Sequence, residues 1–396
     1  MDRRDGAERA YDIVLFGATG FAGELTARYL AEHAPEGCRW ALAGRDPDKL
    51  ERVRERVSGA FPSAADVPLL RADAGDAAAL RELAASTRVL ASTVGPYVLY
   101  GEALVAACAE AGTDYLDLTG EPEFVDRTYV LHDARARETG ARLVHACGFD
   151  SVPHDLGVWY TVQRLPRDVP LRVDGYVRSS AMFSAGTFAS ALTAMGRGPQ
   201  MLRAARERRL HEPRLVGRRA RAPFAGPRFS PQAGAWALPL PTLDPQVVAR
   251  SAAALDRYGP DFRYRHYAAV KTLPVALGGV AAVGAGLALA QVPAARRWLI
   301  GRYEPGRGPD QERRARSWFS VRFVGEGGGR RVLTEVSGGD PGYDETAKML
   351  AESALSLAFD DLPPTSGQVT TAVAMGGALV DRLSAAGIRF RVADAR

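Results

Sequence analysis

Short apolar runs alternate with amphipathic segments along the first 150 residues, which predicts strands joined by helices in βαβ units. Residues 13–16 are apolar at every position, which is typical of a strand buried on both faces of a parallel sheet. We expect strands at residues 13–16, 39–43, 68–72, 89–93, 115–118 and 142–146. We expect helices at residues 23–33, 47–57, 77–85, 101–111 and 125–139. The predicted fold class is α/β, with a Rossmann-type parallel sheet over residues 1–150.

The pattern changes after residue 150, where strand and helix signals no longer alternate regularly. Residues 173–179 predict a strand and residues 187–195 a helix, and a region rich in Arg, Pro and Gly follows from about 196 to 245. Two runs predict a hairpin across residues 325–330, and two helices are expected after it. The hairpin strands are residues 318–324 and 331–337, and the helices are 344–358 and 369–386. These elements predict a second, α+β substrate domain over residues 151–396.

Residues 272–295 carry no charged side chain, and their length suits a membrane span. The segment consists mostly of Ala, Gly and Val, which contribute little free energy of insertion, so a span ranks second. We expect first a membrane-docked or buried helical hairpin. Arg296, Arg297 and Trp298 follow the segment and favour docking, because Trp and Arg suit the headgroup region.

The composition is that of a globular protein, with 46% apolar and 24% charged residues in a chain of 396. Three cysteines are too few and too scattered for a disulfide framework or a zinc knuckle. The first residues are charged and lack the apolar core of a signal peptide. We therefore expect a cytoplasmic protein, with peripheral contact at the inner face of the plasma membrane.

The net charge of +5 is concentrated in residues 201–230, which hold nine arginines against Glu207 and Glu212. This excess would suit an anionic membrane, an acidic partner or an acidic carrier protein, and a solvated loop is an equally good explanation. No aromatic residues interleave the arginines in residues 201–222, and no nucleic-acid motif is present. We therefore expect no nucleic-acid partner.

Three glycines follow the first predicted strand at Gly17, Gly20 and Gly23, and a helix begins after them. In a strand–turn–helix unit, these glycines permit the tight turn, the close approach of a pyrophosphate and close helix packing. The helix N-terminus adds free N–H groups and the positive end of a dipole. The turn therefore predicts a dinucleotide site, with Thr19 and Phe21 among its contacts.

The residue at the end of the second strand distinguishes NADP from NAD. An NAD site usually has a carboxylate there, whereas this strand ends at Arg45. A guanidinium can hold a 2′-phosphate through two parallel hydrogen bonds, and Lys49 adds charge one turn later. Asp46 weakens the argument slightly. We predict NADP(H) as the cofactor.

The ends of the third and fourth strands supply further contacts. Asp73 is expected at the adenine edge, with a helix cap as the alternative. Val94, Gly95 and Pro96 are expected to hold backbone against the nicotinamide. Tyr97 would stack on or bond to a ligand, or alternatively pack in the core.

Polar residues near later strand ends mark a candidate catalytic cleft. The candidates for a proton donor are Tyr97, Tyr100, His145, Asp150 and His154, of which we favour Tyr97, Tyr100 and His154. Cys147 lies among them, but the spacing fits no standard zinc pattern, so we predict no metal. Glu102 and Glu121 are expected to touch a ribose or a substrate amine, or to be solvated.

Several motifs together resemble the saccharopine dehydrogenase-like oxidoreductases, and most closely their actinobacterial trans-acting enoyl reductases. They are GATGFAG (17–23), AGR (43–45), TVGPY (93–97), YGE (100–102), DYLDLTGE (114–121), HACGFDSVP (145–153), GGDPGY (338–343) and ESAL (352–355). The resemblance covers nearly the whole chain. It departs at residues 181–187, where a glycine-rich turn is expected, and this leaves the substrate open.

The resemblance implies an NADP-binding domain followed by an α/β domain. It also implies reduction of an enoyl double bond in a polyketide-derived chain during glycolipid synthesis, with a polyketide synthase or acyl carrier as partner. Two alternatives remain open: an imine- or amine-handling reductase closer to saccharopine chemistry, and a non-catalytic, membrane-peripheral NADP-binding protein.

Overall fold

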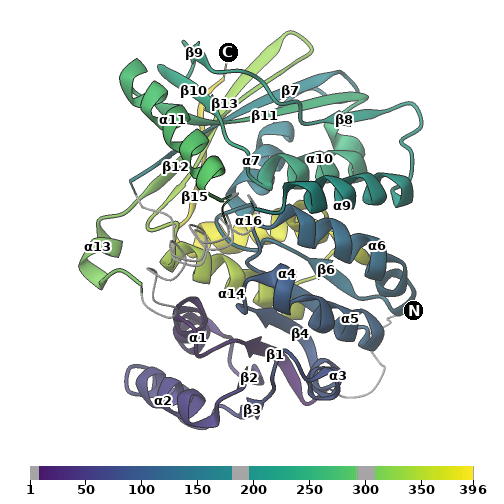
Figure 1. The fold of residues 1–396 in the computed structure, drawn as a ribbon, viewed down its shortest axis with the longest axis vertical. Helices are drawn as coiled ribbons and strands as arrows, with labels where there is room; N and C mark the ends of the chain where they lie inside the picture. The colour runs from purple at the N-terminus through teal and green to yellow at the C-terminus, as the bar shows by residue number, and fades with distance from the viewer. Residues whose placement is uncertain (1–8, 181–195, 291, 293–307, 396) are drawn as a thin grey trace.

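Two β-sheets lie one above the other in the computed structural model, which describes residues 9–180, 196–290, 292 and 308–395 (Figure 1). Helices pack between the sheets and around the lower one (Figure 1). Three features predicted from the sequence lie outside the described residues: the helix at 187–195, the turn at 181–187, and the flank Arg296, Arg297 and Trp298.

The first sheet has parallel strands in the order β14-β6-β5-β4-β1-β2-β3. Its strands are β1 (Tyr11–Phe16), β2 (Trp40–Gly44), β3 (Leu69–Arg71), β4 (Thr87–Ser92), β5 (Asp114–Asp117), β6 (Arg142–Val144) and β14 (Gly367–Val369). The strands predicted in the first 150 residues are confirmed. Ile13 and Leu15 pack on one face of β1, and Val14 and Phe16 pack on the other. Burial on both faces explains the unbroken apolar run.

The predicted helices of this part are also confirmed. They are α1 (Phe21–His33), α2 (Pro47–Ser58), α3 (Ala77–Ser86), α5 (Glu102–Ala111) and α6 (Pro122–Thr139), with a short α4 (Tyr97–Tyr100) and a 3₁₀ turn η1 (Pro62–Ala64) besides. Asp46 caps α2 and Asp76 caps α3 through their carboxylates. Gly112 and Gly140 end α5 and α6 in the left-handed conformation, as glycine does most readily.

The C-terminal part of the chain completes the first sheet. Strand β14 pairs with β6, and α14 (Asp344–Phe359) packs against α1, β4 and β5. Met349, Leu350 and Ala354 of α14 are buried in the same core as Ile13 and Leu15. Residues from both sides of the predicted boundary at 150 therefore build the first sheet.

The second sheet is mixed and follows the order β15-β13-β12-β7-β11-β10-β9, with β8 also paired to β11. Its strands are β7 (Leu171–Ser179), β8 (Arg219–Arg221), β9 (Arg228–Ser230), β10 (Ala235–Pro239), β11 (Asp261–Val270), β12 (Phe319–Gly327), β13 (Arg330–Gly338) and β15 (Arg389–Ala395). Strands β12 and β13 form the predicted hairpin. The predicted strand at 173–179 is β7. The overall α/β class, with a second sheet beside the parallel one, is confirmed.

Helices fill the space between the two sheets. They include α7 (Val152–Val162), α10 (Asp244–Ala254), α15 (Thr371–Ala374) and α16 (Gly376–Ala385), and a 3₁₀ turn η2 (Asp256–Tyr258) follows α10. Helix α7 lies so close to the second sheet that a Cβ on Gly157 would stand 2.3 Å from Phe323 Cε2. Helix α9 (Gly198–His211) lies along α6, and α13 (Gln311–Ala315) precedes β12.

The single helix predicted at 369–386 is not continuous. Val369 belongs to β14 instead, and the rest is divided into α15 and α16 at Gly376, which takes a positive φ of 48°. The Arg-, Pro- and Gly-rich region, to which no element was assigned from the sequence, holds helix α9 and strands β8 to β10. Most of its arginines lie on these elements.

The apolar segment forms one helix, α11 (Leu273–Ala290), so the expected hairpin is wrong over these residues. Several of its described side chains are exposed, including Val275 at 59% and Leu277 at 62%, so it is not buried either. Among the described elements, it packs against β10 and β11. Among the described helices, none is both long enough and apolar enough to cross a membrane.

Candidate functional site

The glycine turn lies at the carboxyl edge of the first sheet, between β1 and α1. Gly17 has a φ of 89°, and a Cβ there would stand 2.7 Å from Thr93 Oγ1 and from Val94 Cγ2. A Cβ on Gly23 would stand 2.3 Å from the Gly17 carbonyl oxygen. Both positions therefore require glycine, one for its backbone and one for close packing of helix on strand.

Gly20 has space beside it instead. A Cβ there would have only the Gly17 carbonyl oxygen nearby, at 3.4 Å, so the position opens away from the protein. Gly20 is also the N-cap of α1, and it has no side chain that could accept a hydrogen bond from the first N–H groups of the helix. The first N–H groups of α1 are therefore available to a phosphate, as a dinucleotide cradle requires.

Phe21 is held from the far end of the chain. Its ring meets Tyr343 edge-to-face with centroids 4.8 Å apart, and the Arg314 guanidinium lies 5.3 Å from its centroid. A Cβ on Gly308 would stand 2.3 Å from the ring. These contacts fix the residue that opens α1. Thr19, at the centre of the turn, is half-buried.

Arg45 extends from the end of β2 into solvent. Within the described residues, its side chain has no hydrogen bond or ion pair. The neighbouring Asp46 carboxylate is already used: it accepts from the Lys49 N–H at 3.1 Å and lies 3.7 Å from Lys49 Nζ. Asp46 is therefore partly neutralised, which reduces its opposition to an anion beside Arg45.

Asp73 follows β3 but does not cap α3. Its Oδ1 accepts from the Gly75 N–H at 2.8 Å, whereas Asp76 supplies the cap. The alternative considered for Asp73 is therefore wrong, since the cap lies three residues later. Asp73 is exposed at the edge of the sheet.

The loop after β4 packs against the glycine turn. Thr93 Oγ1 donates to the Gly17 carbonyl oxygen at 3.0 Å, and Val94 contacts the same glycine. The Gly95–Pro96 peptide bond is cis. The predicted nicotinamide contacts Val94, Gly95 and Pro96 thus lie next to the predicted phosphate cradle, on the neighbouring strand.

Tyr97 holds the ends of β4 and β5 together. Its hydroxyl donates to the Ser92 carbonyl at 3.0 Å and accepts from the Leu118 N–H at 3.1 Å. Burial and the nearby Asp117 carboxylate raise the pKa of Tyr97 well above its ordinary value. The single hydroxyl proton is therefore held in a structural bond, which favours the core role for Tyr97.

Glu121, Tyr100 and Glu102 also lie near this edge of the sheet, and they differ in exposure. Glu121 is buried, and its carboxylate accepts from the N–H groups of Tyr97 and Val98 at 3.0 and 2.8 Å. Tyr100 is 51% exposed. Glu102 pairs with Arg127 at the surface of α5 and α6. Glu121 is thus a structural link, whereas Tyr100 faces outward.

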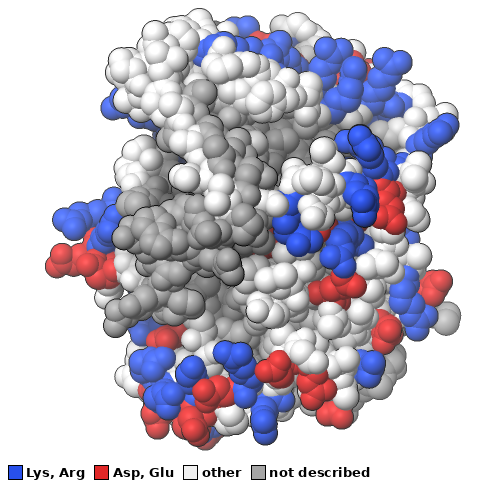
Figure 2. Space-filling model, in the orientation of Figure 1, with Lys and Arg blue, Asp and Glu red and all other residues white. Residues whose placement is uncertain are grey.

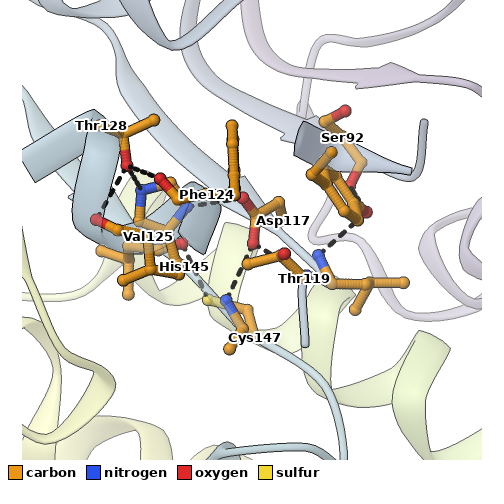
Figure 3. Close-up of polar contacts among 12 residues, drawn as sticks. Ser92, Asp117, Thr119, Phe124, Val125, Thr128, His145 and Cys147 are labelled. Atoms are coloured by element: carbon orange, nitrogen blue, oxygen red, sulfur yellow. Dashed lines mark hydrogen bonds and ion pairs between the residues drawn. The ribbon is translucent and has the colours of Figure 1, made fainter. Parts of the chain in front are cut away.

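His145 belongs to a buried network rather than to an open cleft (Figure 3). Its Nδ1 lies 2.6 Å from Asp117 Oδ2, and its Nε2 lies 3.1 Å from Thr128 Oγ1. Asp117 Oδ1 also accepts from the Ala146 N–H at 2.9 Å, where Ala146 takes a positive φ of 60°. The network fixes the turn that follows β6, and it uses both ring nitrogens of His145.

Asp150 lies at the same carboxyl edge as the glycine turn, in the loop after β6. A Cβ on Gly120, in the loop after β5, would stand 3.1 Å from Asp150 Oδ2. Burial and the Asp244 carboxylate raise the pKa of Asp150 to about 7. A carboxyl group with this pKa is partly protonated at neutral pH, as a general acid must be.

His154 lies deeper, in a cluster that the sequence did not reveal. The carboxylate of Asp244 stands between two imidazoles, 3.8 Å from His154 Nε2 and 3.3 Å from His266 Nε2. All three side chains are buried. Burial lowers the pKa of His154 to about 4, so its ring is neutral at pH 7. Asp244 and His266 lie on α10 and β11, about a hundred residues away, and no spacing motif joins them.

Two imidazoles and a carboxylate are also a donor set that metals use. Their ligating atoms lie within 4.8 Å of one another. Asp244 also accepts from Thr242 and Ser151, and Tyr264 Oη lies 2.8 Å from His266 Nδ1, whereas His154 Nδ1 is buried and has no hydrogen-bond partner among the described residues. The Asp244 carboxylate also acts on Asp150, whose pKa it helps to raise.

A comparison with known protein families bears on the cofactor. Residues 13–144 match the family of the saccharopine dehydrogenase NADP binding domain, and this match identifies NADP(H) as the cofactor. Those residues include the glycine turn, Arg45 and the edge loops after β4 and β5. The cofactor prediction is thereby confirmed.

Curated relatives match along nearly the whole chain. A provisionally named trans-acting enoyl reductase of Mycobacterium tuberculosis is 40% identical over 97% of each chain. A trans-acting enoyl reductase of Mycobacterium ulcerans is 37% identical over 96% of this chain and 97% of its own. Saccharopine dehydrogenase (L-Glu forming) of Saccharomyces cerevisiae shares the fold, with a TM-score of 0.56, 11% identity, and coverage of 97% of this chain and 100% of its own. The chain therefore belongs to the saccharopine dehydrogenase-like, NADP-dependent oxidoreductases, in the branch that contains the trans-acting enoyl reductases.

Proposed function

We propose that this protein reduces the carbon–carbon double bond of an enoyl thioester carried by a polyketide synthase or a separate acyl carrier, during lipid or glycolipid synthesis. The observation that carries the proposal is the position of Asp150, a partly protonated acid, at the same sheet edge as the glycine cradle. The names of the relatives, which match along nearly the whole chain, support the choice of reaction.

The chain offers a cofactor-binding surface along this edge. Gly20 and the first N–H groups of α1 would hold the pyrophosphate, with Gly17, Thr19, Phe21 and Gly23 forming the turn. The exposed Arg45 and Lys49 would hold the 2′-phosphate.

The remaining cofactor contacts follow from the order of the strands. Asp73, beyond β3, would contact the adenine edge. Val94, Gly95 and Pro96 lie beyond β4 and would contact the nicotinamide, since Val94 lies against the glycine turn. On the side of β5 and β6, Asp150 would then be available to the substrate.

The reaction needs a hydride at the β carbon and a proton at the α carbon. Bound NADPH supplies the hydride. As it arrives, the electron pair of the double bond moves toward the α carbon and the thioester carbonyl, and the carboxyl proton of Asp150 is transferred to the α carbon. The products are the saturated thioester and NADP⁺, and Asp150 regains its proton from solvent.

Other predicted catalytic residues take supporting places. Tyr97 fixes the loop at the nicotinamide end, because both of its hydroxyl bonds are to backbone. His154 contributes to the buried cluster whose Asp244 carboxylate favours the protonated form of Asp150. Tyr100 lies at the substrate mouth, where half of its surface is open to an acyl chain.

The test is NADPH oxidation with a panel of enoyl thioesters, followed by a panel of keto acids with amines. Turnover of an enoyl thioester with the saturated thioester as product would support the proposal. Turnover only with the second panel would support imine reduction instead. Tight NADPH binding without turnover on either panel would support a non-catalytic role.

We further propose that the protein works in the cytoplasm, in peripheral contact with the inner face of the membrane. Helix α11 supports this, because it has no charged residue and exposes large apolar side chains such as Val275 and Leu277. Docking of this helix would place the enzyme near lipid-like substrates.

A further inference from the structure

We infer that the exposed face of helix α9 is the docking surface for the acidic face of the acyl carrier that presents the substrate. This inference rests on the proposed function, because it names the surface through which a carrier-bound enoyl group would reach the site. Three features of α9 carry it: how the helix is anchored, what it exposes and where it begins.

Helix α9 is anchored through one set of its arginines. Arg197, at its N-cap, forms two bonds of 2.7 Å to the Glu123 carboxylate of α6. Arg208 forms an ion pair of 2.7 Å with Asp126, which also belongs to α6. With Ala204, these residues form the inner face of α9, and they hold it rigidly on α6.

The outer face of α9 carries a second set of arginines. Arg203, Arg206 and Arg209 are exposed, and within the described residues their side chains have no ion pair. Leu202 and Leu210 lie on the same face, 58% and 85% exposed. Lys and Arg side chains gather over this part of the molecule in Figure 2. The outer face therefore combines three arginines that have no ion pair among the described residues with two largely exposed leucines.

This combination fits an acidic protein partner. Positive charge steers and aligns an acidic surface, and exposed leucines contribute buried apolar area once the two surfaces meet. Helix α11 suits a bilayer better than α9 does, because it is uncharged. The two helices lie apart in Figure 1. The two surfaces thus differ in chemistry and in place.

Helix α9 also begins beside the proposed site. Val98, Glu121, Arg197 and Met201 line one small cavity, so the N-terminal end of α9 lies beside α4, which follows the predicted nicotinamide contacts. The helix extends from there for 14 residues, or roughly 20 Å. A carrier docked on its outer face would therefore release its flexible thioester arm next to the mouth of the site.

The experiment compares one acyl group on two supports. The full chain and the variant R206E/R209E are assayed with a crotonyl group on a phosphopantetheinylated bacterial acyl carrier protein, and with crotonyl-N-acetylcysteamine. We expect kcat/KM for the carrier-bound group to fall about tenfold or more, since interface charge pairs are worth this much. The value for the small thioester should stay within about twofold, because no residue of the cofactor site is changed.

The matched control is R167E/R330E, which reverses two exposed arginines elsewhere. It should change neither value. A second variant, Leu210→Ser, keeps the charge and should weaken the carrier reaction alone. Equal losses on both supports after R206E/R209E would overturn the inference.

A binding measurement separates this inference from the proposed reaction. Titration calorimetry of the holo-carrier against the full chain needs no turnover, and its affinity should fall with added salt and with R206E/R209E. If neither thioester is reduced but this binding is present and lost in the variant, the docking surface stands and the reaction is wrong. The docking surface would be refuted if R206E/R209E left carrier binding unchanged. It would also be refuted if this variant lost binding to anionic vesicles but not to the carrier.

Discussion

The carboxylate of Glu121 accepts the backbone N–H of Tyr97 at 3.0 Å, and so ties the loop after β5 to the loop after β4. The second carboxylate oxygen takes the next N–H along the chain, that of Val98. One buried side chain therefore fixes the loop that we propose to face the nicotinamide, and it can do so without touching the cofactor. The Glu121 carboxylate would therefore affect cofactor binding by holding this loop in place.

Replacing Glu121 by Ala should weaken both the fold and the cofactor site. Two N–H groups lose a charged acceptor, which costs about 1–3 kcal/mol of unfolding free energy. The Kd for NADPH should also rise, because the loop after β4 is released. Urea unfolding and NADPH titration measure the two effects. Glu110→Ala, at an exposed position, is the control and should leave both unchanged.

Arg45→Ala should weaken NADPH binding about 10- to 100-fold, because a charged, two-bond contact to the 2′-phosphate is lost. Binding of NADH should be unaffected. Fluorescence titration with both cofactors tests this, with the exposed Arg81→Ala as the matched variant. Equal affinity of the unchanged protein for the two cofactors would contradict the role of Arg45.

Asp150→Asn should lower kcat by about 100-fold or more, since the amide cannot supply the α-carbon proton. The donor is the protonated carboxyl, whose pKa is raised to about 7. In the unchanged protein, kcat/KM should therefore be highest below this pH and fall as the pH rises through it. A pH–rate profile of both proteins is the measurement. A profile that stays flat from pH 6 to 9 would exclude Asp150 as the donor.

Tyr97→Phe distinguishes a structural hydroxyl from a catalytic one. It leaves the Leu118 N–H without an acceptor, and should lower the free energy of unfolding by about 1–3 kcal/mol. Turnover should stay within a few-fold of the original under conditions where the variant is folded. A loss comparable to that of Asp150→Asn would instead make Tyr97 the acid.

V275D/L277D should reduce sedimentation with anionic vesicles, because burying a carboxylate in the interface is costly. The two positions are among the most exposed of α11, so the fold should be unaffected. Serine at both positions provides an intermediate case. If the aspartate variant sediments as the original does, α11 is not the membrane contact.

The first six strands and their helices could be predicted because each signal is local. A run such as Ile13–Phe16 is apolar throughout, and the helices between the runs begin at residues such as Asp46 and Pro47. Strand β14 has three residues and no distinguishing pattern, so it could not be predicted. Helix α9 was missed because its apolar face is narrow, with Ala204 as its buried centre.

The same distinction applies to the site. Gly17, Gly20 and Gly23 could be recognised because their spacing has a local mechanical reason. The partners of His154 could not, because Asp244 and His266 approach it only when α7, α10 and β11 pack together. From the sequence, Tyr97 could be either a ligand contact or a core residue, and only the structure shows its hydroxyl bonded to the backbone of Ser92 in β4 and of Leu118 after β5.

The return of α14 and β14 to the first sheet has a consequence for synthesis of the protein. A nascent chain that has grown past β6 already contains the whole glycine turn, yet the apolar face around Ile13 and Leu15 is not fully covered until α14 emerges, some 200 residues later. The nucleotide layer thus cannot close early, as the first domain of a growing chain usually does. Fragments truncated near residue 150 should aggregate rather than bind cofactor.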